Sequence, residues 1–236
     1  MIDLYGMTSP NVRKIFFMLE ECGLPYRFHH VRVLHGDQFK DDFLALNPNA
    51  KVPVIIDQDG PAGAPYTVFE SGAILIYLAE KVGRFLPNAG TAKYDTLQWL
   101  MIQVANVGPM LGQLNHFTMV APADNVYSLK RYQTEGRRLY DLLDQRLAEQ
   151  PWLAANEYTI ADIATYPWAL YHQNHGLDWS EHPHLKAWCD RISARPAIER
   201  GAAAIKAIEP IDGKTFQDAP PEALDRFYNR AWMREQ

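Results

Sequence analysis

Hydrophobic and polar positions alternate between strand and helix patterns over the first part of the chain. Residues 2–5 alternate as a short strand. Ser9 and Pro10 then suit the N-cap and the first position of a helix, and apolar residues recur over 12–19 at the spacing of one helix face. Gly23 ends that stripe. The pattern therefore predicts a strand that leads directly into an amphipathic helix.

Further strand patterns complete this first part. Residues 26–33 are rich in β-forming side chains, and a polar helix or loop around 41–43 follows them. Residues 52–56 and 66–69 flank a turn and are typical of a β-hairpin, after which Ser71 is placed to cap another helix. The order strand, helix, strand, helix or loop, two strands and helix predicts a small mixed-sheet α/β domain.

Strand patterns disappear beyond about residue 90. Apolar residues recur at helical spacing over 97–104, 129–147 and 183–192, and Gly108-Pro109 is expected to bend or end the first of these helices. Thr159–Asp162 is a variant of the capping box and opens a further helix. The second part is therefore predicted to be helical throughout.

These patterns define two domains and a tail. We predict an α/β domain over residues 1–85, an all-helical domain over 91–208 and a C-terminal tail over 209–236, with 84–91 as the linker. Pro220-Pro221 and scattered charges indicate a tail that is only partly ordered.

Composition and charge exclude several classes of function. Of the 236 residues 47% are hydrophobic, as in ordinary globular proteins, and the net charge is −5. A chain of this charge has no general attraction for nucleic acid or anionic membranes, and neither a signal peptide nor a spanning helix is evident. Cys22 and Cys189 lie far apart and suit a reducing compartment, so we expect a cytoplasmic protein.

A metal site is not expected from the eight histidines. His172 and His175 lie three residues apart, and His182 and His184 are near neighbours, but neither HExxH nor CxxC is present. The histidines are therefore interpreted as ordinary core or surface residues, and no metal is predicted.

Three short segments carry candidate chemistry. The first is the junction of strand and helix at Thr8–Asn11, where unpaired helix N–H groups, the Ser9 hydroxyl and the Asn11 amide can stabilise a thiolate or another anion. An ordinary helix cap has the same sequence.

The second segment is Val52-Pro53, at the mouth of a strand. A cis peptide bond here would turn the backbone groups of Val52 outward, where an extended peptide can pair with them. Most such bonds are trans, so the sequence alone does not favour cis.

The third segment is Glu70-Ser71, where a strand meets a helix. Glu70 can hold an ammonium group, while Ser71 and the helix end can hold a carboxylate, as in the head of an amino acid. A simple helix cap is the alternative.

Together these segments resemble the cytosolic glutathione transferases. Asn47–Pro53, Phe69–Ile74 and Tyr158–Asp162 are characteristic, and the similarity covers nearly all of the chain before Pro210. Within the family, Ser9–Asn11, Gly36–Phe39 and Gln98–Gln113 resemble bacterial nu-class enzymes, which are glutathione-dependent disulfide-bond oxidoreductases. The resemblance implies a thioredoxin-like domain followed by a helical domain, with glutathione bound as a cosubstrate.

The resemblance also implies roles for individual residues. Val52 pairs its backbone with the cysteinyl part of glutathione across cis-Pro53, and Glu70 and Ser71 hold the γ-glutamyl head. Gln38 and Lys51 face the glycine end.

Further implied roles concern the sulfur and the second substrate. Arg131 resembles an arginine that reaches the active site from the helical domain, and Ser9 and Asn11 stabilise the sulfur. Phe117 and Trp168 are candidate walls of the second-substrate pocket.

The mechanism is restricted by what stands at the start of the first helix. Where dithiol enzymes of the thioredoxin superfamily carry C-P-x-C, this chain has Ser9-Pro10-Asn11-Val12. No catalytic disulfide can form there, so the thiol of glutathione must do the sulfur chemistry. We rank Asn11 first as its activator and Ser9 second, because Ser9 can be committed to capping. Tyr5, near the position used by tyrosine-type transferases, ranks third.

The expected activity is reduction of disulfides by glutathione, with weaker transferase and peroxidase activity. The alternatives are a conjugating, dehalogenating or isomerising glutathione transferase and a non-catalytic glutathione-binding or regulatory protein. We expect a homodimer. We also expect a tail, anchored by Phe216, Phe227, Tyr228 and Trp232, that covers the second-substrate pocket but is dispensable for glutathione binding.

Overall fold

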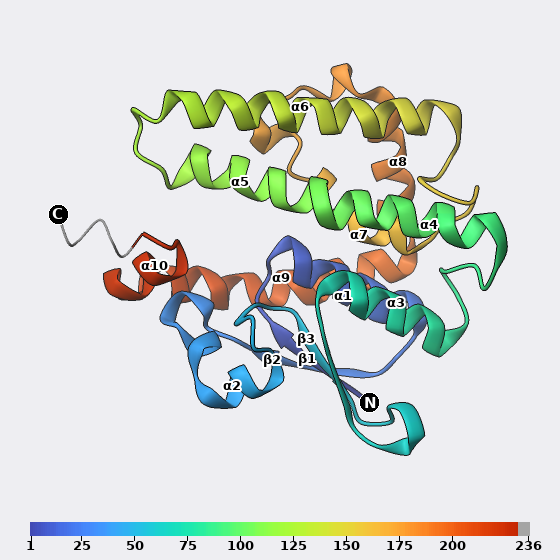
Figure 1. The fold of residues 1–236 in the computed structure, drawn as a ribbon, viewed down its shortest axis with the longest axis horizontal. Coiled ribbons are helices and arrows are strands. Elements are labelled where there is room, and N and C mark those ends of the chain that lie inside the picture. Colours follow the sequence, from blue (N-terminus) through green and yellow to red (C-terminus); the bar gives the residue numbers. More distant parts are fainter. Residues whose placement is uncertain (231–236) are drawn as a thin grey trace. The chain divides into compact units, whose positions relative to one another are not determined.

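The computed structural model describes residues 1–230, which fall into two compact units (Figure 1). The first unit comprises residues 1–74 together with the chain from residue 200 onward, and the second comprises residues 75–199. The first is a thioredoxin-like α/β unit and the second is helical, which confirms the predicted fold class.

The first unit is built on a four-stranded mixed sheet of order β2-β1-β3-β4. Strand β1 pairs with β2 in parallel and with β3 antiparallel, and β3 pairs with β4 as the predicted hairpin. Apolar side chains of the central strands are fully buried, which fixes the register. The strands are β1 (Ile2–Gly6), β2 (Tyr26–His30), β3 (Val54–Asp57) and β4 (Tyr66–Phe69).

Helix α1 (Pro10–Cys22) follows β1 as the sequence predicts. Ser9 is its N-cap, Pro10 is its first residue, and Gly23 ends it in the left-handed conformation that glycine adopts most easily. Its apolar face is buried with the sheet. The remaining helices with residues in this unit are α2 (Asp41–Leu46), α3 (Ser71–Val82), α9 (Pro196–Gln217) and α10 (Pro221–Phe227), with 3₁₀ turns at Val33–His35, Asp37–Phe39 and Pro61–Gly63.

The C-terminal segment is more regular than the sequence indicates. Helix α9 continues through Pro210 to Gln217, and α10 follows it. Residues 209–230 are therefore largely helical, whereas the sequence indicated a partly ordered tail. Leu224 and Phe227 pack against the apolar cluster that contains Val33 and Leu34, and burial of these side chains favours the ordered helix. Trp232, the fourth expected anchor, lies outside the described residues.

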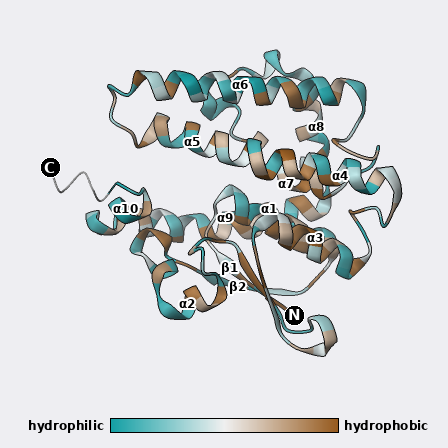
Figure 2. Ribbon diagram, viewed as in Figure 1, coloured by the Kyte–Doolittle hydropathy of each residue, from teal (hydrophilic) through white to brown (hydrophobic). Residues whose placement is uncertain are grey.

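The second unit consists of helices, of which α5 and α6 run side by side (Figure 1). Helix α7 is buried along its whole length, and Figure 2 shows it as a hydrophobic segment, whereas α6 alternates between hydrophilic and hydrophobic residues. Its major helices are α4 (Gly90–Ile102), α5 (Gly108–Met119), α6 (Val126–Glu149), α7 (Ile160–Ala169) and α8 (Pro183–Ser193), with 3₁₀ turns at Gln173–His175 and Trp179–Glu181.

Two local predictions for this unit can be compared with the structure. The capping box at Thr159 is confirmed, because Asp162 accepts from the Thr159 backbone N–H at 3.0 Å and the Thr159 hydroxyl oxygen accepts from the Ala161 N–H at 3.3 Å. Gly108-Pro109 begins α5 rather than ending the helical run, and the preceding residues Gln103–Val107 form a π-helical turn.

Candidate active site

A small cavity in the first unit unites segments that are far apart in the sequence. Its volume is about 150 Å³. It contains six of the residues predicted for the site, and Asn47 in addition. The lining residues are Asn11, Asn47, Lys51, Val52, Pro53, Glu70 and Ser71.

The Val52–Pro53 peptide bond on the cavity wall is cis. Ladder pairing of β3 begins only at Val54, so the backbone of Val52 lies outside the sheet. Asn47 is buried and holds the preceding loop, since its amide donates to the Lys51 carbonyl at 2.7 Å and its side-chain oxygen accepts from the Asn49 N–H at 2.9 Å. Asn47 was not among the predicted site residues, although it opens the motif that carried the resemblance.

Glu70 and Ser71 form the opposite part of the wall at the start of α3. The Glu70 carbonyl accepts the first helical hydrogen bond, from Ile74 at 2.9 Å, so Glu70 and not Ser71 is the N-cap. Glu70 has a φ of +70°, which is uncommon for a residue with a side chain and is a form of strain that clusters at functional sites. The site therefore places an exposed carboxylate beside the free N–H groups of a helix end.

Lys14 is a component of this region that sequence reasoning missed. It lies on α1 with 1% of its surface exposed, and its ammonium group donates to the Ser71 hydroxyl at 3.1 Å. Burial lowers the pKa of Lys14 to about 7, while the negative charge of Glu70 opposes that shift. The signal in the sequence was its place among the mostly apolar residues of the buried face of α1.

Ser9 and Asn11 occupy the N-terminal end of α1. Within residues 1–230 the Ser9 hydroxyl makes no capping hydrogen bond, so the involvement in capping that ranked Ser9 below Asn11 is not observed. Asn11 lines the cavity and is half-buried. The structure thus leaves both polar groups at the end of a helix whose N–H groups favour negative charge.

Tyr5 does not share the cavity with Asn11. It lines a separate pocket of about 320 Å³, which also contains His29 and Phe43. Its ring stacks on His29 with 4.5 Å between centroids. Burial raises the pKa of Tyr5, which makes it a weaker acid.

Gln38 lies in the 3₁₀ turn Asp37–Phe39 and is buried, but it does not line the cavity. Its side-chain oxygen has no hydrogen-bond partner among the described residues. A buried polar atom of this kind requires a partner, and a bound molecule can supply one.

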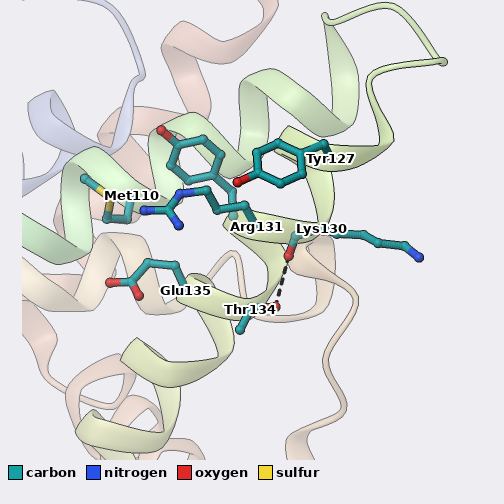
Figure 3. A pocket seen from close by; sticks show the side chains of 7 residues that line it. Met110, Tyr127, Lys130, Arg131, Thr134 and Glu135 are labelled. Carbon is teal, nitrogen blue, oxygen red and sulfur yellow. Dashed lines mark hydrogen bonds between the residues drawn. The ribbon is translucent and has the colours of Figure 1, made fainter.

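Arg131 belongs to the second unit, where it lines a pocket of about 650 Å³ (Figure 3). Figure 3 shows its guanidinium extending toward Met110, while Glu135 lies one turn further along α6. Of the two aromatic residues expected near a second substrate, Phe117 stacks on Tyr132 of this pocket at 5.2 Å, and Trp168 is buried.

The structure offers no metal centre in the part of the chain that it describes. No three His, Cys, Asp or Glu side chains there are grouped so that they could hold an ion. Cys22 and Cys189 are thiols without a disulfide. Likewise, none of the helices within residues 1–230 is long and apolar enough to span a bilayer.

Comparison with known proteins identifies both parts of the chain. The family model of the glutathione S-transferase N-terminal domain matches residues 8–81, and that of the C-terminal domain matches residues 107–196. The chain is 46% identical over 208 residues to the disulfide-bond oxidoreductase YfcG of Escherichia coli, which covers 88% of this chain and 96% of the relative.

Solved structures show the same similarity. A glutathione transferase family member from Pseudomonas fluorescens, with two glutathione molecules bound, has a TM-score of 0.80 and 42% identity, with 85% of this chain and 91% of the other covered. A glutathione transferase from Pseudomonas putida, with one glutathione disulfide bound per subunit, has a TM-score of 0.79 and 38% identity, with 85% and 90% covered.

Proposed function

Because the chain belongs to the glutathione S-transferase family and is an enzyme of that family, we propose that it reduces disulfide bonds with glutathione. One observation carries this proposal. The cavity gathers Val52-Pro53, Glu70-Ser71 and Asn11, while the α1 positions that hold thiols in dithiol enzymes are Ser9 and Val12. The site can hold a thiol-bearing peptide but supplies no thiol of its own.

Glutathione binds along the cavity in this proposal. The backbone of Val52, freed from the ladder beside cis-Pro53, pairs with the cysteinyl unit as an added strand does. Glu70 holds the ammonium of the γ-glutamyl head, and Ser71 with the N–H groups of α3 holds its carboxylate. Gln38 and Lys51 serve the glycine end, where the unpartnered oxygen of Gln38 can accept from an amide.

The N-terminal end of α1 activates the sulfur. The Asn11 amide donates to the thiolate, and the partial positive charge of the helix end stabilises the same anion and lowers the pKa of the thiol. Ser9 is a second donor. The sequence resemblance implies a role for Arg131 as well.

The reaction is two successive thiol–disulfide exchanges. The thiolate of bound glutathione attacks one sulfur of the substrate disulfide, an S–S bond forms to glutathione, and the other sulfur leaves as a thiolate that takes a proton. A second glutathione thiolate then attacks the glutathione sulfur of the mixed disulfide. Glutathione disulfide is produced, and the remaining substrate sulfur leaves as a thiol. Two glutathione molecules are thus oxidised for each disulfide reduced.

The same thiolate can attack other electrophiles. Weaker conjugating and peroxidase activities follow if an electrophilic carbon or a peroxide reaches it, and a mainly conjugating, dehalogenating or isomerising transferase is the alternative. The relative named as a disulfide-bond oxidoreductase favours the reductase.

The test has two steps. Immobilised glutathione should retain the protein, and Glu70→Gln should weaken retention by roughly tenfold, because the ammonium group loses its charged partner. Glu80→Gln, an exposed change on the same helix, is the control. Turnover of a small disulfide should then exceed turnover of a chloro-aromatic electrophile. Failure of retention contradicts the proposed glutathione site, and the opposite order of turnover favours the alternative transferase.

We further propose that the protein is a cytoplasmic homodimer. The apolar and aromatic segment around residues 99–111 suits burial between subunits, and Met101 in this segment is 46% exposed in the single chain. Tyr94, on the same helix α4, is 65% exposed. Sedimentation at micromolar concentration should therefore show about twice the mass of the 27.0 kDa chain. A species of the single-chain mass alone contradicts the dimer.

A further inference from the structure

The loop before α1, residues 7–9, is contacted by helix α9. Asp212 of α9 accepts hydrogen bonds through one carboxylate oxygen from both the backbone N–H of Thr8, at 2.7 Å, and the Thr8 hydroxyl, at 2.5 Å. Its other carboxylate oxygen lies 2.7 Å from Nε2 of His30 on β2. All three residues belong to the first unit, and Asp212 is separated from Thr8 by 204 positions.

The carbonyl of Thr8 is held as well. Arg13 donates from Nε to this carbonyl at 2.9 Å, and from Nη2 to Oε1 of Glu209 at 2.9 Å. Glu209 and Asp212 lie three residues apart and share one face of α9. Helix α9 therefore fixes both the N–H and the C=O of the residue directly before Ser9, one contact directly and one through Arg13.

The bonds to Asp212 are strong ones. A carboxylate that accepts from N–H and O–H donors forms charge-assisted hydrogen bonds, and the Asp212 side chain is only 11% exposed. Other contacts order the two ends of the loop, since Met7 packs against the apolar cluster that contains Val33, and the Ser9 carbonyl accepts from N–H groups in the first turn of α1. At Thr8, between them, the N–H and the hydroxyl are held by Asp212 of α9.

We propose that Asp212 is a positioning residue for sulfur activation, which it supports by holding Thr8 so that Ser9 and Asn11 face the bound thiol. This inference rests on the proposed function, because Asp212 would act only through Ser9 and Asn11 and their contact with glutathione. It connects α9 with the active site within the first unit, and it agrees with the expectation that the C-terminal segment is dispensable for glutathione binding.

The expected effect is on the sulfur and not on the affinity for glutathione. Thr8 does not line the cavity, and the residues proposed to hold the peptide come from the 52–53 and 70–71 segments. Asp212→Ala should raise the pKa of the bound thiol and lower kcat for a small disulfide by about tenfold, as expected when a donor loses its alignment with a developing anion. The dissociation constant of glutathione should change by less than about threefold.

Two further variants separate position from charge. Asp212→Asn keeps an oxygen that can accept from Thr8, so it should retain activity within about threefold of wild type. Asp218→Asn makes the same charge change at an exposed site just beyond α9 and should change nothing. If Asp212→Ala does not fold, Thr8→Val, which removes only the hydroxyl donor, should lower kcat by about threefold with the same affinity for glutathione.

The measurements are thiolate absorbance of bound glutathione against pH, calorimetric affinity and kcat for each folded variant. An unchanged thiol pKa and kcat in Asp212→Ala overturns the inference, and so does an equal loss in Asp212→Asn, because the acceptor is then not what matters. A wild-type protein that binds no glutathione overturns the proposed function instead. The two failures are therefore distinguishable.

Discussion

At the scale of single residues, Lys14 is a buried cation in contact with Ser71 of the proposed glutathione site. The side chain of Lys14, on α1, is buried, and its ammonium group donates a hydrogen bond to the Ser71 hydroxyl. It also interacts electrostatically with the carboxylate of Glu70. Enclosure of a charge costs free energy, since the ion loses its hydration. Because Lys14 lies beneath the proposed γ-glutamyl site, we expect that it supports binding of the glutathione carboxylate through Ser71.

We predict that Lys14→Met raises the stability of the ligand-free protein and weakens glutathione binding. The folded pKa of Lys14 is about 7, below its ordinary 10.5, so between these values the unfolded chain binds more protons. Wild-type stability therefore rises with pH over this range. Chemical denaturation should show the largest gain for the variant near pH 7 and a smaller gain as pH increases. A gain that is independent of pH contradicts the account.

The sequence was sufficient to identify most residues of the cavity, but not their mutual positions. Short motifs around Pro53 and Glu70 carry the resemblance, and the structure unites them. The separation of Tyr5 from Asn11 depends on where one strand ends, and hydrophobic alternation does not determine that to a single residue. The sequence also placed the cap of α3 at Ser71, whereas the structure has it at Glu70. A left-handed φ at a glutamate is uncommon, so the sequence does not predict a cap there.

At the scale of elements, histidines contribute to the contact between α6 and the two turns that precede α8. His175 lies between the Tyr140 hydroxyl, at 2.7 Å, and the side-chain oxygen of Asn115, at 3.0 Å. His172 lies 2.8 Å from His182 and stacks on Trp179. His172 and His175 are buried, and burial lowers the pKa of each so that both are uncharged near neutral pH.

We predict that acid destabilises the second unit through these histidines. Burial lowers the pKa of His172 and of His175 from 6.5 to about 4, so below pH 6.5 the unfolded chain binds protons that the folded chain does not. Stability is lost as pH falls from 6.5 toward 4, by on the order of 1–2 kcal/mol for each histidine at about pH 5.

Melting temperatures across this range test the prediction. His175→Gln should flatten the acid dependence, and His184→Gln, an exposed change, should leave it as in wild type. Equal acid dependence in all three proteins contradicts the role given to the buried pair.

At the scale of the whole molecule, the C-terminal segment is the feature that the sequence predicted least well. Helical periodicity is weak near Pro210 and Pro220-Pro221, so a tail was the simplest interpretation. The contacts that order it are long-range, from Asp212 to Thr8 and from Phe227 to the cluster around Val33. Such contacts leave no local pattern.

We predict that truncation after Pro210 lowers both thermal stability and kcat. The shortened chain loses Asp212 and the apolar residues of α10, and burial of each large apolar side chain contributes about 1.5–3 kcal/mol. Calorimetry and disulfide turnover measure the two losses. Truncation after Asp218 should retain kcat but lower the thermal stability. If both shortened chains keep the thermal stability and the kcat of wild type, the segment contributes to neither.

The pKa of the bound glutathione thiol, compared among wild type, Asn11→Ala and Tyr5→Phe, tests the central claim most directly. Asn11 lines the cavity and Tyr5 does not. Loss of one donor to the thiolate should raise the thiol pKa in Asn11→Ala by about one to two units and lower kcat by roughly ten- to a hundredfold. Tyr5→Phe should leave both nearly unchanged. A larger effect of Tyr5→Phe than of Asn11→Ala would contradict the account and identify a tyrosine-type enzyme.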